Sequence, residues 1–445
     1  MIDIKQIREN PEKFKKAAKD KNYHVNIDTL LALDEQIRQV KKQLQDIATQ
    51  KNQIGKSIPK LSDDDKEAAF AKLMELKDKE QDLKIGGQIS VRWLNMELEK
   101  AESKLNIDEA LREFDELALQ VAQPADDDVP IGKDDTENVE IRREGEIRNF
   151  DFEPKDHVQL GLALGIIDIE RGVKLAGTRN YILKGDGALL HWAVLRFAMD
   201  FMVDKGYVPM SVPLLMKDQT MMGTGFFPGS EDQTYRMEKD QLNLAGTAEV
   251  PLTAYRMGEI LSAEELPLKY VALSSCFRRE AGAAGKDTYG LYRIHQFDKV
   301  EQVVICENSV EQSNKFHNEI LTNAEAVMQA LELPYRIANV CTGDLGRGQV
   351  KKFDIEAWMP SRGNYCETHS ARKFYEFQAR RMNLRYKHPV TKKNHFCHTL
   401  NNTVIASPRI LIPILELYQH ADGSITIPKL LRPYMNGKET INRHS

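Results

Sequence analysis

Long hydrophobic runs are missing from this chain of 445 residues: no stretch of 18 consecutive apolar residues occurs, so no transmembrane helix is predicted. Cysteine is scarce, with five widely spaced residues and no CxxC pair, which argues against a disulfide framework and for a reducing compartment. Neither sign of charge dominates, because 62 Lys and Arg stand against 67 Asp and Glu. That balance excludes a globally basic nucleic-acid binder but leaves room for a basic patch on one domain.

The first residues, Met1 to Glu9, interleave charged with apolar side chains. A secretory signal needs an uninterrupted apolar core, and a transit peptide avoids acidic residues. We therefore expect a cytoplasmic protein with no membrane partner.

Glycine and proline are nearly absent from residues 1–120, which are rich in Lys, Glu, Asp, Gln and Leu. From Leu30 to Ile58 the apolar residues recur in alternating steps of three and four, and only Lys51 interrupts the series. Such a heptad seam predicts a coiled-coil helix. Its members between those ends are Leu33, Ile37, Val40, Leu44, Ile47 and Ile54.

A second helix is predicted after Pro59, where Ser62 or one of the aspartates that follow it can serve as the N-cap. Its apolar seam covers residues 69–83 and then, after a phase slip at Gly86-Gly87, residues 91–105. We expect a local irregularity at the two glycines and an antiparallel helical hairpin overall.

This hairpin has two interpretations, a plain dimerisation coiled coil and an arm that binds nucleic acid. Residues 1–60 hold thirteen Lys and Arg against eight Asp and Glu. The first helices therefore carry an excess of positive charge, which a phosphate backbone would attract.

A linker is predicted at Pro124, Pro130 and the acidic run Asp126–Asp128 between them. Behind it glycine and proline become common, and strand-like runs such as 270–273 and 303–305 mix with helical stretches such as 311–332. This order predicts an α+β fold with a mainly antiparallel sheet. We expect two domains, residues 1–122 and 123–445.

Charged residues concentrate in a predicted strand, loop and return strand: Cys276–Glu280, the glycine-rich Ala281–Asp287 and Leu291–Glu301. Alternation along the return strand puts five side chains on one face, those of Arg293, His295, Phe297, Lys299 and Glu301. Such a face suits a nucleotide, with Arg on phosphate, a ring on the base and Glu on an amino group. A solvated hairpin with cross-strand ion pairs is the alternative.

Two further stretches place polar groups in apolar surroundings. Leu400–Glu416 ends in an apolar helix headed by Arg409, and an unpaired buried charge is costly there. Leu244–Glu249 is an apolar strand end that delivers Thr247 and Glu249. Both patterns favour a functional site over a plain core.

In this order the stretches resemble the three motifs of class II aminoacyl-tRNA synthetases. Residues 177–213 are similar to the dimer-forming motif 1, residues 270–305 to motif 2 and residues 400–418 to motif 3. Thr247-Ala248-Glu249 resembles the substrate loop of one family of the class, the seryl-tRNA synthetases, and Val129–Glu140 resembles the start of that family's catalytic domain. Because the family also begins with a long helical hairpin, the resemblance covers essentially the full length.

The resemblance implies a serine–tRNA ligase that forms seryl-adenylate from L-serine and ATP and transfers the seryl group to tRNA(Ser), as a homodimer. Charging of tRNA(Sec) is left open. Two alternatives are a paralogue that charges another acceptor, such as a carrier protein, and a non-catalytic tRNA-binding relative. A ligase for a carrier protein has no need of a basic helical arm, which disfavours the first alternative. The charged residues of the site are all present, which disfavours a non-catalytic relative.

By the same resemblance, the catalytic residues are Arg278 on the α-phosphate, Arg409 on the γ-phosphate and Glu280 on the adenine amino group, with the ring between Phe297 and Arg409. The implied ATP-binding set is Arg278, Arg279, Glu280, Arg293, Phe297, Glu367, Thr368, His369, Ser370 and Arg409. Glu367 and Ser370 would bind Mg²⁺, which takes oxygen ligands. No zinc is expected, since His395-x-Cys397-His398 matches no zinc signature.

The implied serine site consists of Thr247, Ala248, Glu249, Arg278, Glu301 and Thr403. The charges of these residues complement those of serine, because Glu301 suits its α-ammonium group and Arg278 suits its carboxylate. Glu249 and Thr403 suit its hydroxyl, and a site built to pair a hydroxyl should reject alanine. Departures from the family's pattern include His369 and Arg372, which lie where small residues are usual, and Tyr289, which stands where an arginine is usual.

Overall fold

The computed structural model describes residues 1–86, 89–95, 98–282, 287 and 289–443. The chain divides into two compact units, Met1–Pro124 and Ala125–Ser445. Within those described ranges no helix is long and apolar enough to cross a membrane.

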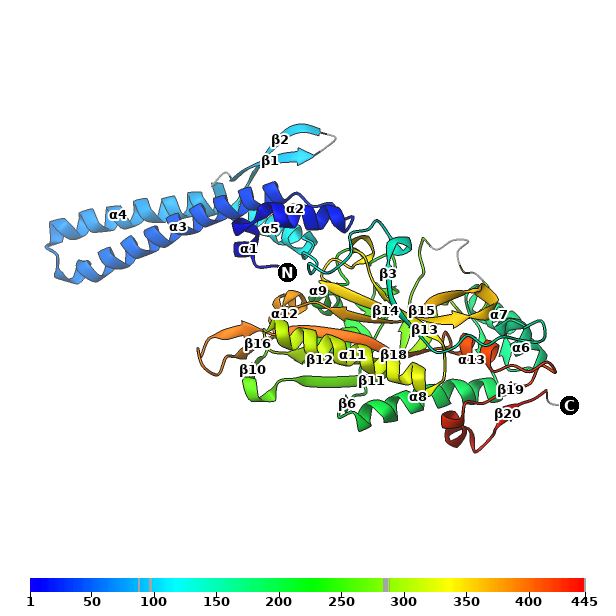
Figure 1. Ribbon diagram of the computed structural model, residues 1–445. Helices are drawn as coiled ribbons and strands as arrows, with labels where there is room; N and C mark the ends of the chain where they lie inside the picture. The colour runs from blue at the N-terminus through cyan, green and yellow to red at the C-terminus, as the bar shows by residue number, and fades with distance from the viewer. Residues whose placement is uncertain (87–88, 96–97, 283–286, 288, 444–445) are drawn as a thin grey trace. The chain divides into compact units, whose positions relative to one another are not determined.

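The first unit is built on a long antiparallel pair of helices, α3 and α4 (Figure 1). Lys51 is the one residue that interrupts the apolar heptad seam of α3. It forms an ion pair with Glu80 on the facing helix α4, with Lys51 Nζ 2.7 Å from Glu80 Oε2. The expected helical hairpin is thus confirmed. The helices of this unit are α1 (Ile4–Glu9), α2 (Pro11–Asp20), α3 (Ile27–Ser57), α4 (Asp63–Gln81) and α5 (Ile107–Gln120).

Helix α4 begins where the sequence predicts. Ser62 is its N-cap, and its Oγ accepts a hydrogen bond from the backbone N–H of Asp65 at 3.4 Å. The acidic residues of the first turn, Asp63 to Asp65, favour the positive end of the helix dipole. A short 3₁₀ turn, Ile58–Lys60, connects α3 to this cap.

The prediction of a helix with an apolar seam over residues 91–105 is wrong. After a π-helical turn at Asp82–Gly86, the chain forms the antiparallel strands β1 (Ile89–Asn95) and β2 (Leu98–Leu105). The turn lies at the predicted phase slip, although Gly87 itself is outside the described residues. In β1 the β-branched and aromatic residues alternate with polar ones, and this period of two suits a strand.

The second unit contains an eight-stranded sheet in the order β3-β13-β14-β15-β18-β12-β11-β6 (Figure 1). All neighbouring strands are antiparallel except β6 and β11, so the expected mainly antiparallel sheet is confirmed. The bounds are β3 (Val139–Glu144), β6 (Val208–Pro209), β11 (Leu268–Phe277), β12 (Gln296–Cys306), β13 (Tyr335–Asn339), β14 (Lys351–Met359), β15 (Asn364–Lys373) and β18 (His398–Ser407).

Shorter elements surround the sheet. The helices are α6 (His157–Ala163), α7 (Ile169–Ala176), α8 (Asp186–Asp204), α9 (Asp218–Thr224), α10 (Glu249–Ala254), α11 (Val310–Ala330), α12 (Phe377–Met382) and α13 (Leu411–Leu417). The strands are β4 (Ile167–Asp168), β5 (Ile182–Leu183), β7 (Leu215–Lys217), β8 (Arg236–Met237), β9 (Leu242–Leu244), β10 (Ile260–Ser262), β16 (Arg385–Lys387), β17 (Asn394–Phe396), β19 (Ile425–Thr426) and β20 (Thr440–Ile441).

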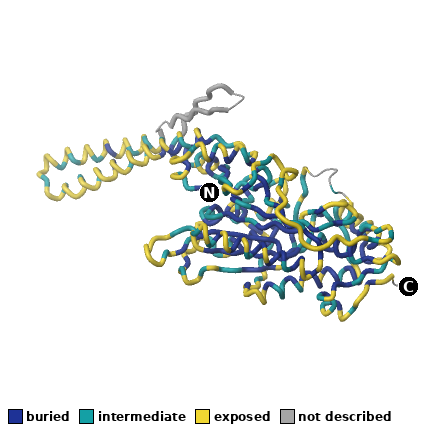
Figure 2. Tube along the Cα trace, viewed as in Figure 1, coloured by how far each residue is buried: buried dark blue, intermediate teal, exposed yellow. Residues whose placement is uncertain are grey.

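Strand β12 separates the core from the opposite face of the sheet. Val300, Val304 and Cys306 pack into the main core together with apolar residues of α8 and α11. Lys299 and Glu301 alternate with them and point to the other side, where they line a pocket. The buried part of the trace accordingly follows the sheet and these two helices (Figure 2).

The three motif-like stretches fold as distinct units within this frame. Residues 177–213 contain α8 and β6, residues 270–305 contain β11, a loop and β12, and residues 400–418 contain β18 and α13. The return strand starts at Gln296 and not at Leu291 as expected. Its ladder partner β11 ends at Phe277, and one further hydrogen bond, from Arg278 N–H to the carbonyl of His295 at 2.9 Å, closes the pair.

Candidate active site

A pocket with an empty volume of about 640 Å³ lies over β12, β15 and β18. Many of the site residues expected from sequence line it: Arg278, Glu280, Arg293, Phe297, Glu301, Glu367, Thr368, Ser370, Thr403 and Arg409. The expected residues outside its lining are Thr247, Ala248, Glu249, Arg279 and His369. The sheet therefore collects residues that are up to 131 positions apart, from Arg278 to Arg409, around one cavity.

Arg278 provides one positive wall of the pocket. Its Cζ lies 5.1 Å from the ring centroid of Phe297, and its Nε donates to the carbonyl of Gly246 at 3.4 Å. Burial lowers the pKa of Arg278, and the nearby charges of Arg372 and Arg409 act in the same direction. An anionic ligand would relieve this crowding of positive charge, so the wall suits a phosphate or a carboxylate.

Glu280 and Arg293 form an ion pair at the mouth of the motif 2 loop, with Arg293 Nη1 2.8 Å from Glu280 Oε2. Glu280 has a φ of 51°, in the left-handed region that non-glycine residues seldom adopt. Arg293 lies in the bend before β12, so it reaches the pocket wall without being part of the strand.

His295 does not share the pocket face with its neighbours, contrary to the expectation from alternation. Its Nδ1 lies 3.0 Å from the carbonyl oxygen of Arg278, and its backbone N–H donates to the carbonyl of Arg179 at 3.2 Å. These bonds hold the turn between the two strands.

Arg409 precedes α13 and is held by three contacts. Its Nε donates to the carbonyl of Tyr292 at 3.2 Å, its Nη1 donates to the carbonyl of Glu367 at 3.0 Å, and its Cζ lies 4.3 Å from the ring centroid of Tyr292. Arg362 also lies over that ring, 4.0 Å from the centroid. Tyr292 is a pocket residue that sequence reasoning missed, because no motif residue signals a cation–π stack between separate segments.

Two acidic residues lie beside Ser370 on β14 and β15. Burial would raise the pKa of Glu367, but the positive charges of Arg409, Lys352 and Arg372 outweigh it and lower the pKa. Asp354 faces Ser370 across the ladder, and burial raises its pKa to about 7 although Lys352 opposes this. Asp354 Oδ1 has no hydrogen-bond partner among the described residues.

Thr247 and Glu249 lie behind two cations that do line the pocket. Lys299 Nζ donates to Thr247 Oγ1 at 2.7 Å, and Arg372 Nη1 donates to Glu249 Oε2 at 3.3 Å. Lys299 also forms an ion pair with Glu301. Strand alternation predicts Lys299 on this face, and Arg372 departs from the family's pattern, but neither is among the site residues expected from the sequence.

His369 is buried in the floor of the sheet and away from the pocket lining. Its neutral ring lies 3.0 Å, at Nε2, from the carbonyl of Val404 and 2.8 Å, at Nδ1, from Thr368 Oγ1. Burial lowers its pKa to about 4. The ladder shifts register next to Thr368 and Val404, so His369 links two β-bulges, features that re-aim side chains beside active sites.

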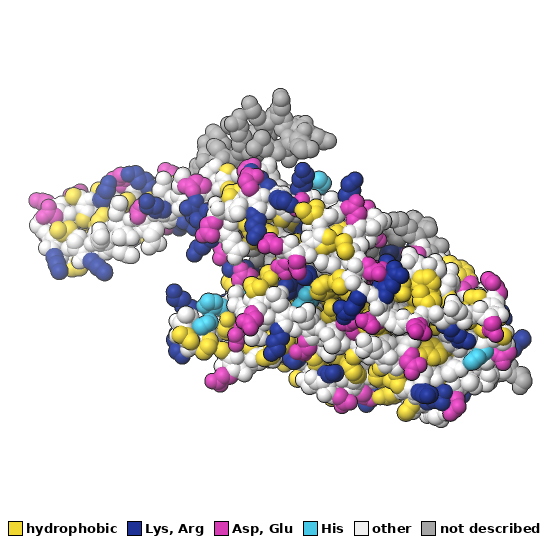
Figure 3. Space-filling model, in the orientation of Figure 1, with side chains coloured by type: hydrophobic (Ala, Val, Ile, Leu, Met, Phe, Trp, Pro, Cys, Tyr) yellow, Lys and Arg dark blue, Asp and Glu magenta, His cyan; other side chains and the backbone are white. Residues whose placement is uncertain are grey.

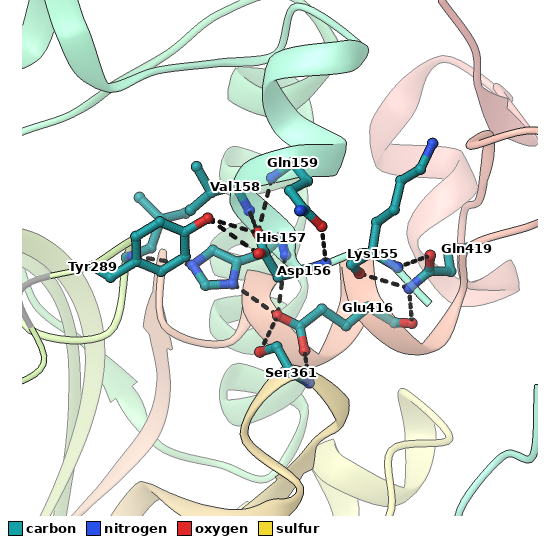
Figure 4. A network of polar contacts seen from close by, with 10 residues as sticks. Lys155, Asp156, His157, Val158, Gln159, Tyr289, Ser361, Glu416 and Gln419 are labelled. Atoms are coloured by element: carbon teal, nitrogen blue, oxygen red, sulfur yellow. Dashed lines mark hydrogen bonds and ion pairs between the residues drawn. The ribbon is translucent and has the colours of Figure 1, made fainter. Parts of the chain in front are cut away.

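A buried carboxylate anchors the far end of the motif 2 loop (Figure 4). Glu416 Oε1 accepts hydrogen bonds from His157 Nδ1–H at 2.8 Å and from Ser361 Oγ at 2.7 Å. His157 Nε2 accepts from the backbone N–H of Leu291 at 3.2 Å. Gly290 lies so close to this ring that a Cβ there would be 2.2 Å from His157 Nε2, and its φ is +73°, so a glycine is required.

Tyr289 belongs to the same network. Its hydroxyl donates to the carboxylate of Asp156, at 3.1 Å from Oδ2 (Figure 4). The residue that departs from the family's usual arginine thus ties the loop to α6 in this structure. Residues 283–286 of the predicted glycine-rich loop, and residue 288 after it, lie outside the described residues.

Comparison with known proteins agrees with this geometry. The family model "tRNA synthetase class II core domain (G, H, P, S and T)" matches residues 233–418, and the model "Seryl-tRNA synthetase N-terminal domain" matches residues 1–88. A serine–tRNA ligase of Deinococcus radiodurans is 44% identical over 443 residues, covering 100% of this chain and 99% of the relative. That of Rubrobacter xylanophilus is 40% identical, with 99% of each chain covered.

Solved structures agree with the sequences. The seryl-tRNA synthetase of Pyrococcus horikoshii complexed with ATP superimposes with a TM-score of 0.89 at 35% identity, covering 100% of both chains. The cytoplasmic serine–tRNA ligase of Naegleria fowleri in complex with AMP gives a TM-score of 0.82 at 29% identity, covering 98% of this chain and 96% of the other.

The antiparallel sheet and the arginine-lined pocket on it are those of a class II aminoacyl-tRNA synthetase core. With relatives of at least 40% identity along its whole length and the matching N-terminal domain, the chain belongs to the seryl-tRNA synthetase family.

Proposed function

We propose that the protein is a serine–tRNA ligase, which activates L-serine with ATP and transfers the seryl group to tRNA(Ser). The observation that carries this proposal is the convergence of Arg278, Glu280, Glu301 and Arg409 on one pocket, in a chain related over its full length to serine–tRNA ligases. We assign residues 1–122 to tRNA binding and residues 123–445 to catalysis, with the three motif-like stretches forming the catalytic core.

In the first step, a carboxylate oxygen of serine attacks the α-phosphorus of ATP. A new P–O bond forms, the bond to the bridging oxygen of the β-phosphate breaks, and pyrophosphate leaves with that electron pair. The nucleophile is already ionised, so no side chain has to remove a proton. Catalysis then consists of positioning and charge neutralisation, with Arg278 on the α-phosphate and Arg409 on the γ-phosphate.

The adenine is placed by motif 2 residues together with Arg409 of motif 3. Glu280 accepts a hydrogen bond from its amino group, and the ring lies between Phe297 and Arg409. Arg293 supports the triphosphate from the mouth of the loop, where it already pairs with Glu280. Arg279 is exposed and Thr368 lies in the pocket wall, so both remain secondary contacts in this proposal. His369 makes no contact with ATP in this proposal and contributes by holding β15 and β18 together.

Mg²⁺ fits the oxygen donors beside the phosphate-binding arginines. Glu367 has a lowered pKa and is therefore ionised, Ser370 offers a hydroxyl, and Asp354 Oδ1 is a buried acceptor with no partner among the described residues. Oxygen donors of this kind are what Mg²⁺ prefers. Glu367 and Ser370 would hold the ion, which when bound would neutralise phosphate charge.

Serine binds at the inner end of the pocket in this proposal. Its ammonium pairs with Glu301, its carboxylate with Arg278, and its hydroxyl lies near Thr403, which is 3.5 Å from Glu301. Thr247, Ala248 and Glu249 form the layer behind this wall, where Thr247 and Glu249 are bonded to wall cations.

In the second step, a ribose hydroxyl of the terminal adenosine of tRNA attacks the carbonyl carbon of seryl-adenylate. An ester C–O bond forms and the hydroxyl proton is released to water, while the bond from the carbonyl carbon to the phosphate oxygen breaks and AMP leaves with that electron pair. The helical arm would hold the tRNA during this step. Lys and Arg side chains occur along both helices of the arm (Figure 3), and Lys41, Lys42 and Lys56 are exposed on α3. We propose that these charges meet tRNA phosphates, in the cytoplasm, where tRNA is charged.

A homodimer is the proposed assembly. Large apolar side chains are exposed on α8 and the adjacent sheet edge: Trp192 (62% exposed), Val203, Val208 and Leu273. Strand β6 is the terminal strand of the sheet, so its outer edge offers unpaired backbone groups. A second copy would cover both.

The test is transfer of labelled serine onto unfractionated bacterial tRNA with ATP and Mg²⁺, beside pyrophosphate exchange with a panel of amino acids. We expect serine alone to support both reactions. Exchange without tRNA charging would favour another acceptor, such as a carrier protein. Tight tRNA binding with no exchange for any amino acid would favour a non-catalytic relative.

A further inference from the structure

Arg372 stands between Glu249 and the pocket. Its Nη1 donates to Glu249 Oε2 at 3.3 Å, and its Nε donates to Ser370 Oγ at 3.3 Å. The other carboxylate oxygen of Glu249, Oε1, accepts from Gln378 Nε2 at 2.9 Å. Both oxygens of Glu249 are thus engaged by the protein, and the guanidinium of Arg372 is the group that lines the cavity.

The solvent exposure of the two side chains agrees with Arg372 lying between Glu249 and the pocket. The side chain of Glu249 is 2% exposed, whereas that of Arg372 is 27% exposed. Burial raises the pKa of Glu249, and the charge of Arg372 opposes that rise. A guanidinium carries five N–H donors, more than the two bonds to Glu249 and Ser370 use. Arg372 can therefore donate to a ligand while its own position stays fixed.

The neighbours of Arg372 on β18 are polar as well. Arg372 is paired with Asn401 across the ladder, and Thr403 follows two residues further along β18. Side chains at paired positions and at steps of two share a face. Asn401 is 1% exposed, yet within the described part of the chain neither its Oδ1 nor its Nδ2 has a hydrogen-bond partner. An unpaired buried amide is costly. Asn401 lies behind the pocket lining, whereas Arg372 and Thr403 line it, so the surroundings of Arg372 on this face are polar and suit a polar group of a ligand.

We propose that Arg372 reads the side chain of the amino-acid substrate, by donating a hydrogen bond to the hydroxyl oxygen of serine. This rests on the proposed function, whose serine site it completes. The serine hydroxyl in turn donates a hydrogen bond to Thr403 Oγ1. Glu249 acts through Arg372 as a positioning residue, together with Ser370.

Recognition of this kind explains how the site separates serine from alanine and glycine. Those amino acids lack the oxygen, so they leave the donors of Arg372 unpaired in a confined cavity, and such a loss discriminates strongly. A guanidinium in place of a small residue also fills the side-chain end of the site, which leaves less room for the methyl group of threonine.

The test is pyrophosphate exchange by the full chain with serine, alanine, glycine and threonine. The variants are Arg372→Met, Arg372→Lys and the double variant Glu249→Gln/Arg372→Met, which leaves no unpaired buried charge. Exposed Arg443→Met is the matched control. For Arg372→Met we expect the KM for serine to rise about tenfold or more, as for loss of a charge-assisted hydrogen bond. The KM for ATP should rise by a smaller factor, because Arg372 contacts the ATP side of the pocket only through Ser370.

Arg372→Lys should recover part of the serine KM, and the preference for serine over alanine should narrow in Arg372→Met. The double variant should keep the raised serine KM, because Glu249 has no substrate contact of its own. Recovery in the double variant would show that Arg372 only neutralises Glu249 and would overturn the inference. So would an unchanged serine KM in Arg372→Met. If the wild-type chain activates no serine at all, the proposed function itself is overturned.

Discussion

Arg409 and Tyr292 are joined twice, once through the backbone and once through the ring. The guanidinium Nε donates to the Tyr292 carbonyl at 3.2 Å, and Cζ lies 4.3 Å above the phenol ring. Tyr292 follows Leu291, whose N–H is bonded to His157. The network around Glu416 thereby sets the position of the arginine that we assign to the γ-phosphate and the adenine.

Replacing Tyr292 with Leu should weaken ATP binding. Loss of the cation–π contact leaves Arg409 less well placed, and such contacts contribute about 0.5–2 kcal/mol, so we expect the KM for ATP to rise about 3- to 10-fold in serine-dependent exchange. Tyr292→Phe keeps the ring and the carbonyl and should stay near wild type. Equal defects in both variants would mean that the hydroxyl, and not the stack, matters.

Shortening the arm should separate the two half-reactions. The ion pair of Lys51 with Glu80 marks where α3 and α4 lie side by side, so residues 52–79 can be replaced by a short Gly/Ser linker without disturbing Leu30, Leu33 and Ile37, which are buried at the base. Pyrophosphate exchange should remain normal, while the KM for tRNA in charging rises about tenfold or more through lost phosphate contacts. A parallel loss of exchange would contradict a dedicated tRNA arm.

Trp192→Asp should dissociate the proposed dimer. Trp192 is 62% exposed in a single chain, so the substitution costs little folding free energy, but it places a charge in an apolar interface. Sedimentation should show a monomer, whereas Val390→Asp, at a residue that is 81% exposed on the turn between β16 and β17, should leave the dimer intact. A Trp192→Asp protein that remains dimeric would place the interface elsewhere.

Buried histidines should make the second unit sensitive to acid. Burial lowers the pKa of His369 to about 4, that of His398 to about 4 and that of His317 to about 3, whereas histidine in an unfolded chain titrates near 6.5. Between pH 6.5 and about 4 the unfolded chain binds more protons, so the free energy of unfolding falls as pH falls. Each such histidine contributes about 1.4 kcal/mol per pH unit.

The check is the Tm at pH 7.5 and at pH 5. His369→Gln, whose amide can still donate to the Val404 carbonyl, should show a smaller drop in Tm than the wild type. Exposed His420→Gln is the control and should show the full drop. A His369→Gln protein with the wild-type drop would mean that this ring is protonated in the folded state.

Sequence periodicity was sufficient for much of the framework. The heptad seam of α3, the Ser62 cap and the apolar strands β11 and β12 all follow from local pattern, because a helix or strand must bury one side. The prediction of a helix over residues 91–105 was wrong, because the apolar residues there fit both a heptad repeat and the period of two of a strand, and the chain forms β1 and β2. The sequence pattern also predicted that β12 begins at Leu291, five residues before its observed start at Gln296. The strand begins at Gln296 because that residue pairs with Phe277, the last residue of its antiparallel partner β11.

By itself, the sequence determined the helical arm, the α+β class, the antiparallel sheet and, through its resemblance to one family, most of the residues that line the pocket. Only the tertiary structure decided which of them face the cavity. Lys299 and Arg372 stand in front of Thr247 and Glu249, and His369 links two bulges instead of facing the cavity. The physical reason is that ladder register and the pairing of buried charges depend on strands far apart in the chain, which local spacing does not encode.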